Sequence, residues 1–150
     1  MRLCDYLRGQ FVVAGLKAQN KPDVLAELVA PVADVFPEVD PKAALKVLLD
    51  RESLGSTGIG DGVAIPHGKM ADLNEIVIVA GRSEEGLDFD ALDHKPCHIF
   101  FLVLAPEHVA GMHLRVLAQI SRLLSSETFR EAFLAAKDSQ SLWDLLQSHA

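Results

Sequence analysis

The sequence lacks the features that mark secreted, membrane-spanning or disulfide-stabilised proteins. It has two cysteines, Cys4 and Cys97, and no Cys-x-x-Cys pair, so no disulfide framework is indicated. The longest apolar run, 99–105, has seven residues, whereas a membrane-spanning helix needs about twenty. Charged residues interrupt the N-terminus, which excludes the apolar segment of a secretory signal. We therefore expect a soluble cytoplasmic protein with reduced thiols and no direct membrane insertion.

Basic stretches are also missing. The formal net charge is −7, and no run rich in lysine and arginine is available to follow a nucleic acid backbone. An acidic surface suits a basic protein partner or serves solubility. With 150 residues, no internal repeat and no low-complexity linker, the chain is expected to form one domain, 1–150.

Apolar periodicity predicts an α/β protein, with a mixed β-sheet flanked by helices on both faces in a single domain. The runs 75–82 and 98–104 are almost continuously apolar, which is typical of central strands covered on both sides. The expected strands are 11–16, 63–66, 75–82 and 98–104, and the expected helices are 22–35, 41–51, 112–124, 126–136 and 139–148. Leu114 and Leu117 are expected on the buried stripe of helix 112–124.

A glycine-rich segment, 55–62, lies between the second helix and the strand 63–66. Its four glycines indicate a loop with unusual backbone angles, and successive backbone N–H groups there could bind an anion. The spacing matches neither a P-loop nor a dinucleotide fingerprint, and the loop follows a helix rather than a strand. An irregular connection without function is equally compatible with the loop alone.

His67 is the candidate reactive residue. The strand 63–66 is expected to end at Pro66, which places His67 just past a strand end, with Gly68 removing bulk on its other side. A neutral imidazole is a competent nucleophile because one ring nitrogen keeps its lone pair near pH 7. A lone histidine at such a place is otherwise a hydrogen-bonded polar residue.

Several polar residues are candidates for binding an anion beside His67. Arg51, at the end of the second helix, offers a guanidinium for phosphate oxygens, although a partner for the helix dipole is an equally common role. Ser56, Thr57 and Gly58 offer hydroxyl and N–H donors in the glycine loop. His113 begins the helix 112–124, where an anion is attracted, but an ordinary surface histidine remains the alternative.

No metal site or cofactor is expected. His94 and His98 are four residues apart, but they lead into a strand, where that spacing does not bring ligands together.

The stretch 48–68, LLDRESLGSTGIGDGVAIPHG, closely resembles the fructose/mannitol and nitrogen-regulatory class of enzyme IIA domains of the bacterial phosphotransferase system (PTS). The layout from Asp93 to Ala118 also follows this class. The resemblance implies protein-histidine phosphoryl transfer: His67 accepts phosphate from the phosphocarrier HPr or a paralogue, with Arg51 and His113 as supporting residues. It further implies either transfer of the phosphate to an enzyme IIB or phosphorylation-dependent binding to a regulated target protein.

The mechanism expected from this resemblance uses one ring nitrogen of His67 as nucleophile, while a backbone carbonyl holds the other. Arg51, His113 and the loop N–H groups would stabilise the phosphoryl oxygens. Two alternatives remain at this point, a non-catalytic interaction module and a domain that binds small anions or nucleotides.

Overall fold

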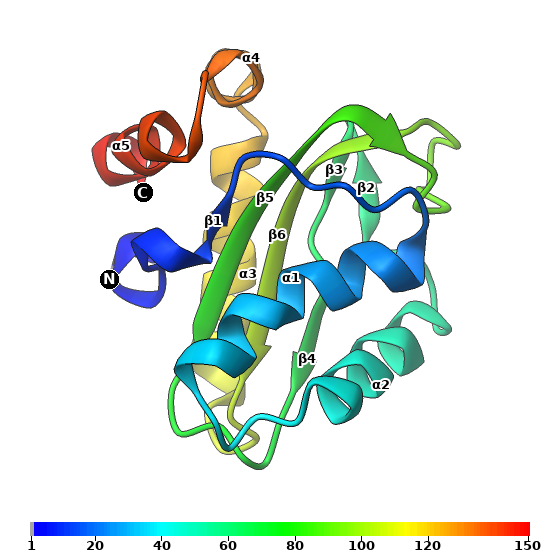
Figure 1. Ribbon diagram of the computed structural model, residues 1–150, viewed down its shortest axis with the longest axis vertical. Helices are drawn as coiled ribbons and strands as arrows, with labels where there is room; N and C mark the ends of the chain where they lie inside the picture. Colours follow the sequence, from blue (N-terminus) through cyan, green and yellow to red (C-terminus); the bar gives the residue numbers. More distant parts are fainter. Residues whose placement is uncertain (1) are drawn as a thin grey trace.

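A six-stranded mixed sheet forms the centre of the computed structural model, which describes residues 2–150. The strand order is β1-β5-β6-β3-β2, and β4 also pairs with β6. β5 and β6 are antiparallel, whereas β1 runs parallel to β5, and β3 and β4 run parallel to β6 (Figure 1). The strands are β1 Val12–Val13, β2 Gly58–Gly60, β3 Val63–Ala64, β4 His67–Lys69, β5 Val77–Leu87 and β6 Cys97–Ala105.

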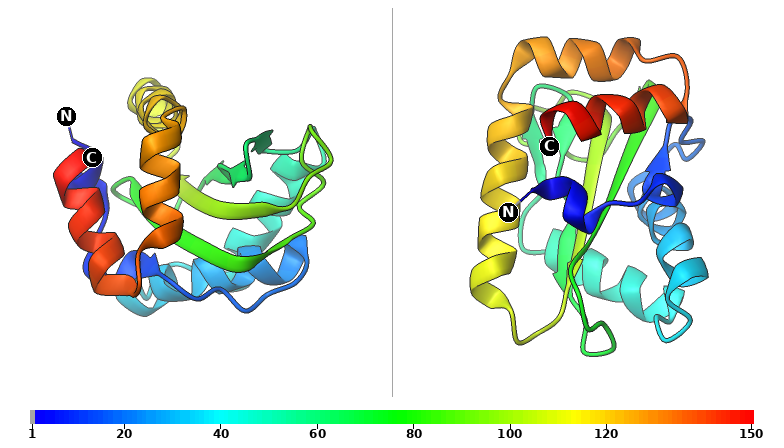
Figure 2. Two further views of the ribbon diagram at one scale, coloured as in Figure 1. Left: turned by 90° about the horizontal axis from the view of Figure 1, so that it is seen from above. Right: turned by 90° about the vertical axis from the view of Figure 1, so that its left-hand side faces the viewer.

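Helices cover both faces of the sheet, as expected from the sequence. α1 and α2 lie on one face, and α3, α4 and α5 lie on the other with the N-terminal segment (Figure 2). The helices are η1 Leu3–Tyr6, η2 Gly9–Phe11, α1 Lys21–Val35, α2 Pro41–Glu52, α3 Ala110–Leu124, α4 Glu127–Ala135 and α5 Ser139–His149. The α/β fold class is confirmed.

β6 shows why its sequence is almost continuously apolar. Successive side chains of a strand point to opposite faces of the sheet. Phe100 and Leu102 therefore pack with α1 and α2, whereas Phe101 and Val103 pack with α3, α4 and α5. Both faces are buried, and no position on the central part of the strand is left for a polar side chain.

Polar caps fix the starts of the helices. The Asn20 side chain accepts a hydrogen bond from the backbone N–H of Asp23 at the start of α1. Asp40 does the same for the N–H of Lys42 at the start of α2, where Pro41 occupies the first helical position. These residues satisfy backbone donors that have no partner inside the helix.

Three details of the predicted strands are wrong. The first strand spans only two residues, because Phe11 belongs to the short helix η2. Leu16 lies outside the strand, although its N–H donates a hydrogen bond to the carbonyl of Arg82 in β5. The glycine segment is not entirely a loop, since β2 within it forms a short hairpin with β3. The chain also does not leave the sheet at Pro66: the Pro66 carbonyl accepts from the Val103 N–H, and His67 begins β4.

The buried stripe of α3 differs from the prediction as well. Its buried residues are His113, Val116, Ile120 and Leu124, whereas Leu114 is 69% exposed and Leu117 half-buried. Ile120 and Leu124 are buried as predicted, whereas in the first half of the helix the buried residues, His113 and Val116, each precede a predicted leucine by one position. His113 occupies the inward position that a leucine was expected to take.

Candidate functional site

His67 is held at the start of β4 in a fixed orientation. Its Nδ1 lies 2.9 Å from the carbonyl oxygen of Ile65. A carbonyl oxygen only accepts, so Nδ1 carries the proton and donates, and Nε2 keeps its lone pair. The hypothesis of one nitrogen held by a backbone carbonyl therefore agrees with the geometry.

A cavity of about 510 Å³ opens beside this imidazole. β4, α2 and α3 form its walls, because β4 pairs with β6 and α3 follows β6 directly in the chain. The lining residues are Val47, Asp50, Arg51, Leu54, His67, Gly68, Lys69, Ala110, His113, Leu114 and Leu117. The candidate residues His67, Arg51 and His113 thus share one cavity.

His113 faces His67 across this cavity. The ring centroids are 5.7 Å apart with an interplanar angle of 79°, an edge-to-face arrangement. His113 is only 4% exposed, so it is not the surface residue considered as an alternative. Among residues 2–150, no hydrogen-bond partner contacts its Nε2. Burial is the main cause that lowers the pKa of His113 to about 4, and the charge of Lys69 and that of His67 when protonated act in the same direction.

The environment also favours neutral His67. Burial lowers the pKa of His67 below its usual value, and the Ile65 hydrogen bond opposes this effect. The nearby Arg51 guanidinium lowers the pKa of His67 further, whereas the Glu52 carboxylate raises it. The net direction is downward, so the imidazole is uncharged at neutral pH, the form in which a histidine can act as a nucleophile.

Arg51 contacts the backbone just beyond α2 and also borders the His67 cavity. Its Nη1 donates to the carbonyl of Gly55, 2.9 Å away, just beyond the end of α2. The side chain also lines the His67 cavity and a smaller adjoining cavity of about 150 Å³.

Ser56 and Thr57 line the smaller cavity together with His67. Each has a protein partner in the structure: the Ser56 hydroxyl donates to the Phe89 carbonyl, and the Thr57 hydroxyl donates to the Glu52 carboxylate. The Gly58 N–H bonds the Ser56 Oγ. Their direct contact with phosphate stays a prediction.

Sequence reasoning missed two charged residues here. Lys69 lies on β4 two positions after His67 and lines the same cavity. The alternation of a strand would have indicated this shared face, but the strand was expected to end at Pro66. The other is Glu52, which directly follows Arg51 and is buried. The only feature of the sequence that could have pointed to Glu52 is its position next to Arg51.

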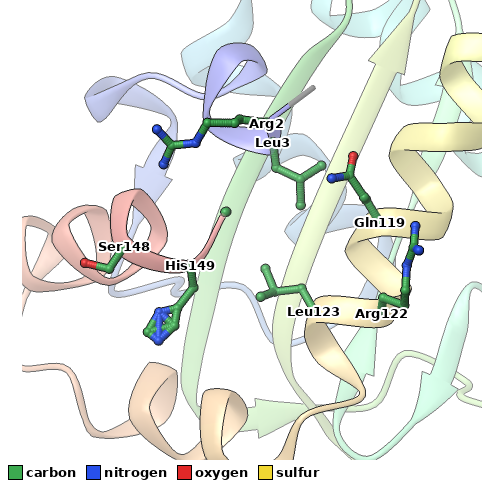
Figure 3. Close-up of a pocket in the computed structure, with 8 residues that line it drawn as sticks. Arg2, Leu3, Gln119, Arg122, Leu123, Ser148 and His149 are labelled. Carbon is green, nitrogen blue, oxygen red and sulfur yellow. The ribbon is translucent and has the colours of Figure 1, made fainter.

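Other parts of the molecule do not add to this site. A second cavity of about 500 Å³ lies between η1, α3 and the end of α5 (Figure 3). Arg2 points there toward α5 and donates to the Gln147 carbonyl. This cavity shares no lining residue with the His67 cavity. Within residues 2–150, no group of three histidine, cysteine, aspartate or glutamate side chains is placed to hold a metal ion, and no helix is long and apolar enough to cross a membrane.

Both the sequence and the fold match known proteins. Residues 5–149 match the family model of the phosphoenolpyruvate-dependent sugar phosphotransferase system, EIIA 2. The chain belongs to this family. A nitrogen regulatory protein from Bradyrhizobium diazoefficiens is 36% identical over 146 residues, covering 97% of this chain and 95% of that protein.

Two further relatives represent the two branches of the family. A PTS fructose-specific EIIA component from Haloferax volcanii is 41% identical over 107 residues, 71% of this chain and 70% of that protein. The crystal structure of nitrogen regulatory protein IIA-Ntr from Neisseria meningitidis superimposes with a TM-score of 0.88 at 30% identity, covering 95% of this chain and 97% of that one. The resemblance inferred from residues 48–68 is therefore confirmed, and the chain is an EIIA-type PTS domain with a role as phosphoryl carrier or as regulator.

Proposed function

We propose that His67 is the phosphoryl acceptor of this EIIA domain and that its Nε2 is the attacking atom. The observation that supports this most directly is the 2.9 Å contact between Nδ1 and the Ile65 carbonyl, which leaves the Nε2 lone pair available. The lowered pKa of His67 keeps that lone pair free of a proton at neutral pH.

The transfer needs no metal and no cofactor. The lone pair of Nε2 forms a bond to phosphorus while the bond between phosphorus and the donor's histidine nitrogen breaks. The electron pair of the broken bond returns to the donor's ring. The protein contributes alignment and charge stabilisation, since phosphoryl transfer requires little other covalent chemistry.

Arg51 and His113 are assigned to the phosphoryl oxygens. The guanidinium of Arg51 stays charged and keeps further N–H donors besides the one bonded to Gly55. His113, buried and neutral, donates from Nε2, which has no partner among the described residues. Ser56, Thr57 and Gly58 line the adjoining loop, and their contact with phosphate belongs to this proposal.

An apolar rim around the cavity suits a protein as donor and acceptor. Leu54 is 83% exposed and Leu114 is 69% exposed, and both line the mouth of the His67 cavity. Exposed leucines at a functional cavity are typical of a docking surface. We assign this rim to the phosphocarrier HPr or a paralogue, and in turn to an enzyme IIB or a regulated target protein in the cytoplasm.

The decisive experiment is phosphorylation with purified donor proteins and phosphoenolpyruvate, followed by intact-protein mass spectrometry. The wild-type protein should gain the mass of one phosphoryl group, and His67→Ala should gain none. His149→Ala, a change at an exposed histidine of another cavity, is the matched control and should label normally. Stoichiometric histidine phosphorylation of His67→Ala would overturn the proposal.

The same reaction separates the remaining alternatives. A pure interaction module would show no mass gain, and a nucleotide-binding domain would show nucleotide binding by calorimetry. His113→Ala should slow labelling without abolishing it, because the acceptor atom remains. Transfer from the labelled protein to an IIB cysteine indicates sugar uptake, whereas a target bound in only one phosphorylation state indicates regulation.

The proposal also includes a single domain that spans residues 1–150, which the family match over residues 5–149 supports.

A further inference from the structure

Glu52 is a buried carboxylate directly behind the His67 cavity. Its side chain is 3% exposed, and carboxylates this buried are rare unless they are paired. Lys21 Nζ lies 3.0 Å from Glu52 Oε1. The Thr57 backbone N–H donates to the same oxygen at 3.2 Å, and the Thr57 hydroxyl donates to Oε2.

A continuous series of hydrogen bonds leads from this carboxylate to the imidazole. Glu52 holds Thr57 by both its N–H and its hydroxyl. The Thr57 carbonyl accepts from the Ile65 N–H at 3.0 Å. The Ile65 carbonyl in turn accepts from His67 Nδ1 at 2.9 Å. The position of the carbonyl that selects the tautomer of His67 therefore depends on Thr57 and Glu52.

The ion pair also joins the start of α1 to the end of α2. Lys21 is the first residue of α1, only 15% exposed, and its Nζ lies 4.7 Å from the ring centroid of Phe89. Glu52 is the last residue of α2, next to Arg51. A buried ion pair seldom adds stability compared with apolar residues of the same volume. Stability therefore does not explain why this pair is buried, whereas holding the end of α2 in one position does.

We propose that Glu52 is a positioning residue that holds His67 with Nδ1 protonated and fixes the turn of α2 that carries Arg51. It acts through Thr57 and Ile65 and does not touch the phosphoryl group. This inference rests on the proposed function for its effect on transfer, but its effect on the His67 tautomer is independent of any donor protein. It also gives the Thr57 hydroxyl a role other than phosphate contact.

The test replaces the ion pair and, separately, the hydroxyl. Lys21→Met combined with Glu52→Leu removes both charges and every side-chain acceptor for Thr57. Thr57→Val removes only the hydroxyl, and Thr57→Ser keeps it. Phe133→Leu, a core change on the opposite face of the sheet, is the control for general loss of stability.

Two measurements are made on each variant, ring ¹⁵N chemical shifts of His67 and the rate of phosphorylation. In the wild type we expect the neutral tautomer with hydrogen on Nδ1. In the double variant we expect a mixture of tautomers and a kcat lower by about tenfold to 100-fold with little change in KM. Thr57→Val should lie in between, Thr57→Ser should keep the wild-type tautomer of His67, and Phe133→Leu should match the wild type in both measurements.

Each contrary outcome is decisive. Wild-type tautomer and rate in both the double variant and Thr57→Val would refute the positioning role. An equal tautomer change in Phe133→Leu would also refute it, because destabilisation alone would then suffice. If the wild type accepts no phosphate, the proposed function fails, and the tautomer measurements still decide whether Glu52 positions His67. If the double variant does not fold, the comparison of Thr57→Val with Thr57→Ser decides.

Discussion

Replacing Gly68 with alanine should destabilise the protein because β4 and α2 touch at this glycine. A Cβ at Gly68 would lie 2.5 Å from Cγ1 of Val47. Two carbon atoms prefer a separation of about 3.5–4.0 Å, so the new methyl would overlap by about 1 Å. Valine in a helix has one strongly preferred rotamer, and its methyl cannot easily swing away.

The expected loss follows from this overlap. Overpacking of a well-packed site costs about 1–3 kcal/mol, and we expect about 2 kcal/mol for Gly68→Ala. In a chain of this length, that loss lowers Tm by about 4–8 °C. Phosphorylation should slow as well, because moving β4 from α2 separates His67 from Arg51.

The assay is urea denaturation followed by circular dichroism. Gly15→Ala is the matched control, since no atom lies within 4 Å of the added Cβ, and its stability should stay within about 0.5 kcal/mol of wild type. In Val47→Ala combined with Gly68→Ala, the space vacated by Val47 accommodates the new methyl, so the losses should be non-additive by about 1 kcal/mol or more. Strict additivity, or a Gly68→Ala protein as stable as the control, would refute the close contact.

Three further predictions concern charge, a buried cation and the apolar rim. The pKa of His113 is lowered from 6.5 to about 4 in the folded protein, so between these pH values the unfolded chain binds a proton that the folded protein does not. The contribution of His113 to the unfolding free energy should therefore fall as the pH decreases from 6.5 to 4 and stay constant below pH 4. In urea denaturation at several pH values, His113→Gln should remove up to about 3 kcal/mol of this pH dependence. Arg82→Met should lower the unfolding free energy by about 3 kcal/mol. The reason is that Arg82 is only 2% exposed and its guanidinium donates to backbone carbonyls at the end of α4. An unchanged Tm would contradict this prediction. Leu54→Ser and Leu114→Ser should raise the KM for the phosphodonor several-fold while stability stays within about 0.5 kcal/mol; an unchanged KM would argue against docking at the rim.

The error in α3 illustrates what periodicity leaves open. Leucines recur at helical spacing on more than one side of this helix, so the period alone does not select the buried side. The sheet selects it, because α3 packs on the side of β6 that carries Phe101 and Val103. That choice buries His113 and leaves Leu114 at the mouth of the cavity.

Local sequence determined the helices α1 to α5, the central strands β5 and β6, and the place of His67 directly after Pro66. The caps at Asn20 and Asp40, the apolar run of β6 and the restriction imposed by Pro66 act within a few residues, so they can be read without knowing the fold. The family was likewise evident from the stretch 48–68.

The tertiary structure alone decided how the site is assembled. β4 and α3 are distant in sequence, and only their common packing on β6 brings the ring centroids of His113 and His67 to within 5.7 Å of each other. The burial of Glu52 between α1 and the glycine segment likewise depends on contacts between distant parts of the chain. Spacing in a sequence fixes the period of a helix or strand, but long-range contacts fix which side faces the core, and those contacts set the pKa values and the geometry of the reacting groups.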